Sequence, residues 1–392
     1  MSYIDRKIGD LVNRALAREK SILLLGPRQT GKTTFLDHQV KPDLTFSFAH
    51  IATRLHYEKN PVAFAQELKL ETEKYDRKPL VLIDEVQKIP LIMDVAQDFI
   101  DKKMAQFILT GSSARKLKHG AHVNLLPGRV VSLVMDPLTL EEIPTHIKLD
   151  DLLLYGSLPN IITEADEDNK ENDLYSYVST YLEEEVRAEA LVRNIGHFAR
   201  FLELAAGESG LIVNFTKLSQ EIGIAASTIA DYYQVLEDCL IIQRIDPITD
   251  GITHRRLIKS PKYLFFDLGV RRACANEGVR LSSRTLAHLF EQYIGLELMR
   301  YARLKSPKIK LKYWRDSAGP EIDFVIDVTH HYIPIEVKWS AHPNLSDAGH
   351  LVKFMQEYKV DTAYIVCNAP KAYKISPHIT ALPWQELAVL FG

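Results

Sequence analysis

The sequence predicts an α/β protein of several parts, and three observations support that prediction. An apolar run followed by a glycine-rich turn near the N-terminus is typical of a strand leading into a helix. Helical patterns fill the middle, and the last hundred residues contain one helical pattern followed by strand-like runs. A chain of 392 residues has room for two or three domains. We expect the parts to span residues 1–163, 164–207, 208–280 and 281–392.

Composition indicates an ordinary globular chain without a membrane segment. The chain is 46% hydrophobic and 25% charged, and no apolar run approaches the ~18–20 residues that span a bilayer. The N-terminus lacks the apolar region of a secretory signal. Cys239, Cys274 and Cys367 show neither metal-ligand spacing nor a disulfide framework, so each is expected to be a buried thiol. These features predict a cytoplasmic protein with no membrane partner.

The most informative stretch is Gly26–Thr33, which satisfies the pattern G-x-x-x-x-G-K-[ST] at every fixed position. The apolar run Ser21–Leu25 precedes it as a buried strand, and a helix is expected from Thr34 onward. Backbone N–H groups of such a loop cradle phosphate, while Lys32 would reach the β- and γ-oxygens and the Thr33 hydroxyl would hold Mg²⁺. The sequence therefore predicts bound ATP and Mg²⁺, with contacts from Gly26, Pro27, Arg28, Gln29, Thr30, Gly31, Lys32, Thr33 and Thr34.

A second apolar run, Leu80–Ile83, ends in two carboxylates, Asp84 and Glu85. A buried parallel strand has this pattern, with its polar residues at the carboxyl end, where α/β sheets bind ligands. We expect Asp84 to hold the Mg²⁺, directly or through water, and Glu85 to orient the water that attacks the γ-phosphate. Taken alone, the run could be a solvated strand end, but its pairing with the phosphate loop favours the catalytic interpretation.

Two further segments contain candidates for contact with the γ-phosphate. The strand-like run Ala105–Leu109 ends in a polar turn, where Thr110 or Ser112 could sense the phosphate or position water. The alternative for this turn is an ordinary helix cap. Arg129, which precedes another strand-like run, could reach a neighbouring subunit's γ-phosphate and stabilise the transition state. Its alternative is a turn arginine held by a carboxylate.

One more strand fits between the phosphate loop and the strand that ends in Asp84. Residues Thr45–Phe48 alternate polar and apolar side chains, as strands do. An inserted strand, together with an acidic residue directly after the Mg²⁺ aspartate, resembles the AAA+-like branch of the P-loop ATPases. The chain is less similar to the nucleotide kinases and the GTPases.

The middle of the chain is predicted to be a polar linker followed by helices. Residues 164–173 are almost wholly polar, and residues 174–193 have a helical pattern. Residues 211–245 then resemble a winged helix-turn-helix, in which Thr216 and Ser227 cap two short helices. Gly223 marks the turn between these helices. Strands near residues 240–242 and 254–262 would form the wing. Such a module binds DNA through sequence-independent phosphate contacts or docks a protein.

Charge is distributed unevenly, although the net charge is only −3. Residues 141–190 contain 14 acidic and 3 basic residues, whereas residues 251–320 contain 15 basic and 5 acidic residues. The basic segment is a candidate nucleic-acid surface. The alternative is a set of solvated faces that pair with the acidic segment of the same chain or of a neighbour.

The last hundred residues contain a second chemical signal. Asp323 and Glu336 lie on two strand-like runs that are adjacent in the sequence, so they can converge on one cation such as Mg²⁺. Lys338 would point to the same face as Glu336 and could lower the pKa of a metal-bound water or hold the attacked phosphate. Glu291 could complete the metal shell from a helix. This order of residues resembles the PD-(D/E)XK, or restriction-endonuclease-like, nucleases, although Ile322 replaces the usual proline. The alternative is a related fold without activity.

Nearly the whole chain resembles one prokaryotic family of AAA+-like ATPases with a C-terminal restriction-endonuclease-like domain. The resemblance is carried by GPRQTGKTT, LVLIDEVQ, ILTGSS, LPGRV, YLEEEVR, KYLFFDLG and EIDFVI…IEVK. It implies an ATPase domain, a winged-helix segment and a nuclease-like α/β domain in a homo-oligomer, either a ring or a partial ring. The expected function is ATP hydrolysis that is coupled to DNA binding and to Mg²⁺-dependent DNA cleavage. The alternative is an ATP-driven oligomeric switch whose inactive C-terminal domain docks protein partners.

Overall fold

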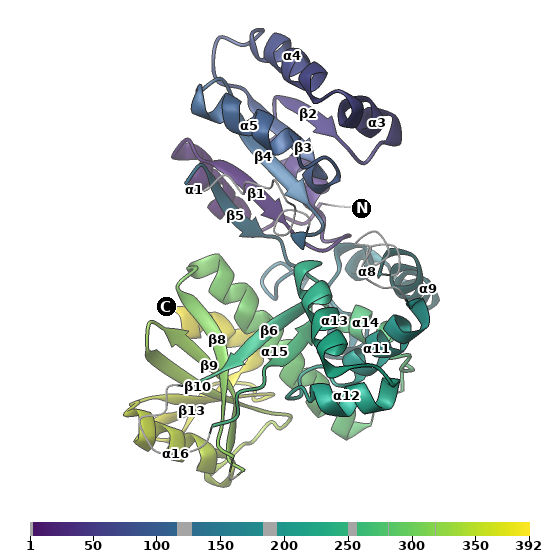
Figure 1. Ribbon diagram of the computed structural model, residues 1–392. Helices are drawn as coiled ribbons and strands as arrows, with labels where there is room; N and C mark the ends of the chain where they lie inside the picture. The colour runs from purple at the N-terminus through teal and green to yellow at the C-terminus, as the bar shows by residue number, and fades with distance from the viewer. Residues whose placement is uncertain (1–2, 116–127, 183–193, 250–256, 281, 318) are drawn as a thin grey trace.

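The computed structural model describes residues 3–115, 128–182, 194–249, 257–280, 282–317 and 319–392. Within these ranges the chain forms two sheets joined by a helical middle part, so the predicted α/β class is confirmed. Figure 1 shows the N-terminal sheet at the top, the C-terminal sheet at the bottom and the helical part beside the latter. None of the described helices is both long and apolar enough to cross a membrane.

The N-terminal sheet is parallel, with strand order β2-β3-β4-β1-β5. Every run predicted as a strand in this part forms one, and the ends are shifted by two residues at most. The central strands are continuously apolar because helices cover both of their faces. The strands are β1 (Ser21–Leu25), β2 (Leu44–Ser47), β3 (Leu80–Asp84), β4 (Gln106–Gly111) and β5 (Val130–Val134).

Alternate residues of β1 face different helices. Ile22 and Leu24 pack against α1 (Gly9–Ala17) and α2 (Lys32–Phe35). Leu23 and Leu25 belong to the opposite core, with side chains from α3 (Ile51–Lys59), α4 (Pro61–Thr72) and α5 (Ile92–Asp101). This packing fixes the carboxyl end of β1, and therefore the phosphate loop, against two layers of helices.

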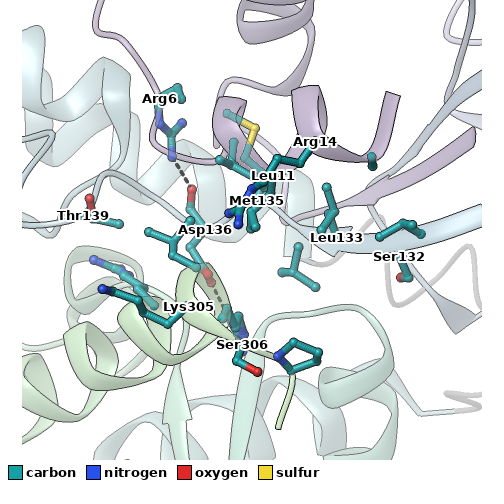
Figure 2. Close-up of a pocket in the computed structure, with 18 of the residues that line it drawn as sticks. Arg6, Leu11, Arg14, Ser132, Leu133, Met135, Asp136, Thr139, Lys305 and Ser306 are labelled. Atoms are coloured by element: carbon teal, nitrogen blue, oxygen red, sulfur yellow. Dashed lines mark hydrogen bonds and ion pairs between the residues drawn. The ribbon is translucent and has the colours of Figure 1, made fainter. Parts of the chain in front are cut away.

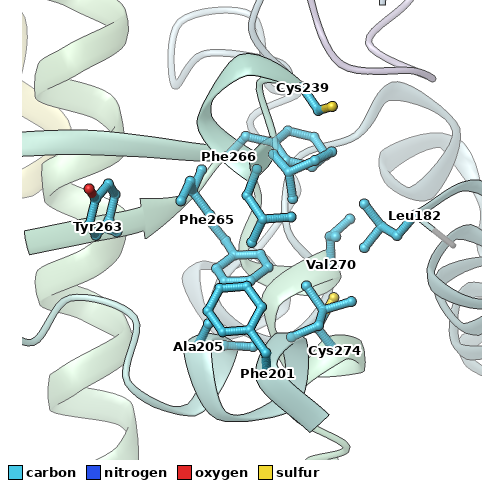
Figure 3. Close-up of a cluster of buried hydrophobic side chains, with 14 of the residues drawn as sticks. Leu182, Phe201, Ala205, Cys239, Tyr263, Phe265, Phe266, Val270 and Cys274 are labelled. Carbon is cyan, nitrogen blue, oxygen red and sulfur yellow. The ribbon is translucent and has the colours of Figure 1, made fainter. Parts of the chain in front are cut away.

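The middle part is a helical cluster around one apolar core, part of which Figure 3 shows. The buried thiols of Cys239 and Cys274 lie in it, and Cys367 is also buried and free, so the prediction for the cysteines is confirmed. The helices are α7 (Leu149–Tyr155), α8 (Pro159–Thr163), α9 (Glu167–Ser176), α11 (Ile195–Gly207), α12 (Phe215–Ile222), α13 (Ala226–Asp238) and α14 (Leu268–Cys274).

The C-terminal sheet has the strand order β12-β13-β11-β10-β9-β8-β6-β7 and mixes parallel with antiparallel pairs. Its strands are β6 (Ile242–Pro247), β7 (Lys262–Phe265), β8 (Ile309–Arg315), β9 (Glu321–Val328), β10 (His331–Lys338), β11 (Ala363–Cys367), β12 (Tyr373–Ser376) and β13 (Ile379–Pro383). The long helix α15 (Ser283–Lys305) packs on this sheet, and α16 (Gly349–Tyr358) packs against β9 and β10.

Helix α15 approaches the sheet closely because Gly295 has no side chain. A Cβ atom at that position would lie 2.6 Å from Cζ of Phe324 on β9. This contact places one helix against both the sheet of the C-terminal part and, as described below, the end of β5.

Several expectations for the middle of the chain were wrong in detail. The polar segment 164–173 is not an extended linker, because α9 begins at Glu167 with the Asp166 carboxylate capping its N-terminus. Helix α12 is capped by Asn214 rather than Thr216. Helix α13 begins directly after Ala225, so the predicted cap Ser227 lies inside the helix. Gly223 does mark the turn, with φ of 80°.

The predicted wing is also different. Strand β6 pairs with β7 in an antiparallel manner, but its far end pairs with β8 and so joins the C-terminal sheet. Two strands of the 208–280 segment therefore extend the sheet of the 281–392 segment. Residues 250–256, where part of the basic wing was expected, lie outside the described residues.

Candidate functional site

The phosphate loop connects β1 to α2 in the way that its sequence predicts. Gly31 precedes α2 with φ of 88°, a left-handed conformation that favours glycine. A Cβ atom at Gly26 would lie 2.5 Å from the Met135 carbonyl oxygen, so the loop can pass β5 only without a side chain there. The Lys32 ammonium donates to the carbonyl oxygens of Gly26, at 2.7 Å, and Pro27, at 3.0 Å. The lysine therefore lies across the loop, and Thr33 is exposed beside it.

The carboxyl ends of β3 and β4 bring together the polar residues that the sequence singled out. Thr110 donates its hydroxyl to Oδ1 of Asp84 at 2.6 Å, and Ser47 on β2 donates to Oδ2 at 3.1 Å. These two hydrogen bonds orient a carboxylate at the edge of the sheet where the phosphate loop also lies. Ser47 was missed, and its only signal is a polar residue at the end of the neighbouring strand.

Glu85 is held by a separate pair of donors. Its Oε2 accepts from Nε2 of Gln87 at 2.7 Å and from the Ser112 hydroxyl at 3.3 Å, and its backbone N–H donates to Thr110. Glu85 also adopts a left-handed φ of 59°, which is strained for a residue with a Cβ atom. The sequence identified Glu85 and Ser112 but not Gln87, which ends LVLIDEVQ and whose hydrogen bond to Glu85 is not apparent from the sequence.

A buried arginine outside any motif fixes the back of the phosphate loop. Arg6 is 7% exposed, and its guanidinium donates to the Thr30 carbonyl oxygen and to the Asp136 carbonyl oxygen, each at 2.7 Å (Figure 2). Nε of Arg6 lies 3.2 Å from Oε2 of Glu142. Sequence analysis missed Arg6 because its partners are backbone groups from distant segments.

The segment after β5 is in turn tied to α15. The Arg303 guanidinium pairs with the Asp136 carboxylate and donates to the Gln243 amide oxygen at 3.0 Å. One turn earlier on the helix, the buried Arg300 pairs with Glu297 at 2.6 Å, and Glu297 accepts the Leu140 backbone N–H at 2.8 Å. Hydrogen bonds and ion pairs therefore run from the phosphate loop to the helix that packs on the C-terminal sheet.

Cavities adjoin this region on more than one side. One of about 320 Å³ lies beside the phosphate loop and is lined by Tyr3, Gln29, Gly31, Thr34 and His38, with the Tyr3 and His38 rings stacked at 4.5 Å. A larger one of about 760 Å³ lies between α1, β5 and the C-terminal end of α15, and Figure 2 shows residues on its walls. The smaller cavity therefore combines an aromatic wall with a position beside the phosphate loop.

Arg129 lies far from its own phosphate loop. It precedes β5, whose register pairs Val130 with Ser21 at the start of β1, whereas the loop follows Leu25 at the other end. Its guanidinium forms a two-point contact with Asp101, at 2.6 and 2.9 Å. This arrangement matches the alternative of a turn arginine held by a carboxylate, and a role in trans stays a prediction.

Many basic side chains of residues 251–320 form ion pairs within the chain. The Arg272 guanidinium pairs with Glu171 of the acidic segment, as the alternative interpretation of the charges expected. Other cations of the segment also pair with carboxylates, namely Lys262, Arg271, Arg300, Arg303, Lys312 and Arg315. Nearly half of the basic residues counted above therefore contribute to internal ion pairs rather than to an open nucleic-acid surface.

The C-terminal candidates are brought together on α15, β9 and β10. Asp323 accepts the Val337 backbone N–H at 2.8 Å, and Lys338 donates to Glu336 at 2.7 Å. Glu291 lies 3.7 Å from the ammonium of Lys262, which pairs with Glu321 at 2.6 Å. Burial and the neighbouring Asp323 raise the pKa of both Glu291 and Glu336 to about 8. Lys262 and Glu321 begin KYLFFDLG and EIDFVI, but they were not identified as site residues because the sequence does not show that they pair with each other.

The carboxylates of this cluster are not arranged to coordinate Mg²⁺. Across the described ranges, no group of three or more His, Cys, Asp or Glu side chains is arranged to hold a metal ion. Magnesium prefers near-octahedral oxygen coordination, whereas these carboxylates are directed to lysines and to a backbone N–H. The predicted metal shell of Glu291, Asp323 and Glu336 therefore does not fit the geometry.

Family models match three consecutive segments of the chain. Residues 18–144 match an AAA domain, and residues 146–280 and 286–387 match domains of unknown function, DUF8612 and DUF4143. The chain thus contains a P-loop ATPase domain of the AAA type.

Sequence similarity to other proteins extends over almost the full length of this chain. The uncharacterized protein Rv2008c of Mycobacterium tuberculosis is 25% identical over 380 residues, which cover 96% of this chain and 82% of that protein. The uncharacterized protein MJ1637 of Methanocaldococcus jannaschii is 23% identical over 423 residues, covering 95% and 85% respectively. These relatives show that the three segments occur together elsewhere in the same order and at similar length.

Solved structures give weaker similarity. A signal-transduction ATPase with numerous domains from Pyrococcus horikoshii aligns with a TM-score of 0.27 and 9% identity, over 77% of this chain but only 47% of that one. Cdc6p from Pyrobaculum aerophilum aligns with a TM-score of 0.24 and 12% identity, over 70% of this chain and 93% of that one. Both TM-scores are too low to establish a shared fold over the whole chain.

Proposed function

We propose that the AAA domain of this chain binds ATP with Mg²⁺ and hydrolyses it. The observation that carries the proposal is the pair of oriented carboxylates, Asp84 and Glu85, at the same sheet edge as the loop that contains Lys32. Lys32 and the loop N–H groups would hold the phosphates, and Thr33 and Asp84 would hold Mg²⁺. Bound Mg²⁺ would neutralise charge on the β- and γ-phosphates.

Glu85 would orient the attacking water. Its carboxylate has two fixed donors, Gln87 and Ser112, so it is aimed before the nucleotide arrives. Positioning a general base in this way contributes about 10²–10⁴-fold to a rate. The adenine base of ATP would lie in the cavity next to Tyr3 and His38. This cavity adjoins the phosphate loop at Gly31 and Thr34.

ATP binding is tested by calorimetric titration of the full chain with a non-hydrolysable ATP analogue and Mg²⁺. Lys32→Ala should abolish the heat of binding, whereas Lys69→Ala, which removes an exposed lysine of α4, should leave it unchanged. Equal binding by the wild type and Lys32→Ala would refute the assignment of the loop.

DNA binding and oligomer formation belong to the same proposal but rest on the sequence. The internal pairing of the basic segment favours the alternative in which the C-terminal half docks a protein. A salt titration of DNA binding separates the two, because neutralised phosphates give a steep loss of affinity with rising salt. Plasmid incubated with Mg²⁺ or Mn²⁺ in the presence and absence of ATP tests cleavage, with Asp323→Ala as the control.

A further inference from the structure

Four carboxylates gather at one end of the C-terminal sheet. Glu291 comes from α15, Glu321 and Asp323 from β9, and Glu336 from β10. Asp323 and Glu336 are mostly buried, and the charges of all four act on one another. Negative charges crowded in a buried place need a cation nearby.

The cation that the structure brings into this cluster is a lysine. Lys262 begins β7, and its side chain is 4% exposed. Its ammonium lies 2.6 Å from Oε1 of Glu321 and 3.7 Å from Oε1 of Glu291, and 5.0 Å from the centre of the Tyr313 ring. Its backbone is fixed by pairing with Ile245 on β6 and by a bridge to Ile212. Contacts of the backbone and contacts of the ammonium therefore both hold Lys262 in place.

Three other carboxylate oxygens of the cluster also have donors. Arg315 lies 2.9 Å from Oε2 of Glu321, the Val337 N–H is 2.8 Å from Oδ2 of Asp323, and Lys338 is 2.7 Å from Oε1 of Glu336. In the described part of the cluster, Oε2 of Glu336 is the buried carboxylate oxygen without a hydrogen-bond partner. Glu321, Asp323 and Glu336 each give at least one oxygen to a protein donor, whereas Mg²⁺ takes near-octahedral oxygen coordination.

We propose that the Lys262 ammonium takes the place of a divalent cation among these carboxylates. The cluster is then balanced by lysine and arginine side chains, and the C-terminal domain works without a metal ion. Lys262 is a positioning residue in this account, because it holds Glu291 and Glu321 on α15 and β9 next to each other. The inference is independent of ATP binding, since it concerns residues far along the chain from the phosphate loop.

The test is a titration of the nucleotide-free full chain with Mn²⁺. Electron paramagnetic resonance measures binding as the loss of the signal of free Mn²⁺. Wild type and Glu336→Gln should bind equally, because the cluster does not hold the ion. Lys262→Met should gain one Mn²⁺ site, because four carboxylates then lack their central cation. Its affinity should be at least about tenfold higher than that of any Mn²⁺ binding by the wild type. The double variant Lys262→Met/Glu336→Gln should lose that site again.

Two controls keep the proposal open to refutation. Lys338→Met removes a lysine at the edge of the cluster and should give a smaller gain than Lys262→Met, since Lys338 contacts a single carboxylate in the described structure. If Lys262→Met does not fold, as judged by circular dichroism, the comparison of wild type with Glu336→Gln still decides. A Mn²⁺ site in the wild type that disappears in Glu336→Gln would overturn the proposal.

Discussion

Arg303 on α15 forms an ion pair with Asp136, whose own carbonyl oxygen accepts a hydrogen bond from Arg6. Arg6 in turn donates to the Thr30 carbonyl oxygen inside the phosphate loop. Glu291, in the C-terminal carboxylate cluster, lies on the same helix as Arg303. A change in the loop can therefore reach the C-terminal sheet through side-chain contacts and one rigid helix, which is a physical route for coupling the two parts.

Arg303→Met should uncouple the two parts without removing nucleotide binding. The substitution deletes the ion pair with Asp136 but does not touch the loop. We expect an ATP analogue to change amide hydrogen exchange in α15 of the wild type and to have no such effect in the variant, at equal affinity. Arg284→Met, at an exposed position of the same helix, is the matched control. An unchanged response in Arg303→Met would remove this route from the account.

Arg6→Met should weaken both the fold and ATP binding. The variant leaves the Thr30 and Asp136 carbonyl groups and the Glu142 carboxylate without their buried partner. Breaking one side of such a buried pair lowers the free energy of unfolding by roughly 3–5 kcal/mol. Urea unfolding and analogue titration measure the two effects, and Arg14→Met on the exposed face of α1 should change neither. A stable variant with wild-type affinity would contradict the role of Arg6.

The C-terminal cluster should make stability depend on pH. The pKa of Glu291 and of Glu336 rises from 4.5 to about 8 in the folded state, through burial and then through Asp323. A carboxyl group with a raised pKa stabilises the fold fully below its unfolded pKa, and this contribution is lost as the pH rises through the folded pKa. The free energy of unfolding should therefore fall between pH 5 and pH 8.

Glu336→Gln tests this dependence. The amide cannot ionise, so the loss of stability between pH 5.5 and pH 8.5 should become smaller by about 1 kcal/mol or more. Urea unfolding at the two pH values measures it. Glu73→Gln changes an exposed carboxylate at the end of α4 and should leave the difference as it is in the wild type. The same slope in wild type and Glu336→Gln would exclude a raised pKa at this position.

Gly295→Ala should loosen the contact between α15 and the C-terminal sheet. The added methyl group would overlap the Phe324 ring, and overpacking of this kind lowers the free energy of unfolding by about 1–3 kcal/mol. Gly207→Ala, at the end of α11, meets no atom within 4 Å and is the control. Thermal unfolding of the two variants measures the difference, and equal midpoints would show that the helix can shift without loss.

The sequence predicted the N-terminal part well because its signals are local. A continuous apolar run identifies a buried parallel strand, and the loop pattern fixes where β1 ends and α2 begins. The partners of Arg6 and Lys262 could not be predicted in this way, because Thr30, Asp136, Glu291 and Glu321 are far from them along the chain. The prediction of a wing was wrong for a related reason, because the pairing of β6 with β8 is set by tertiary packing.

Charge counting had a similar limit. The excess of positive charge in residues 251–320 suggested a nucleic-acid surface, but the sign of a residue does not say where its side chain points. Arg271, Arg272 and Arg300 are buried and paired within the chain. Composition therefore indicated two segments of opposite charge, but only Arg272 among these three pairs with the acidic segment, and Arg271 and Arg300 pair with carboxylates of the basic segment.

Phosphate release from ATP by the wild type and by Glu85→Gln, with the binding of ATP followed in parallel, tests the central claim most directly. The account predicts steady turnover by the wild type and a loss of about 10²-fold or more in Glu85→Gln, with ATP still bound in the presence of Mg²⁺. Equal turnover by the two proteins, or no turnover by a wild type that binds ATP, would contradict it.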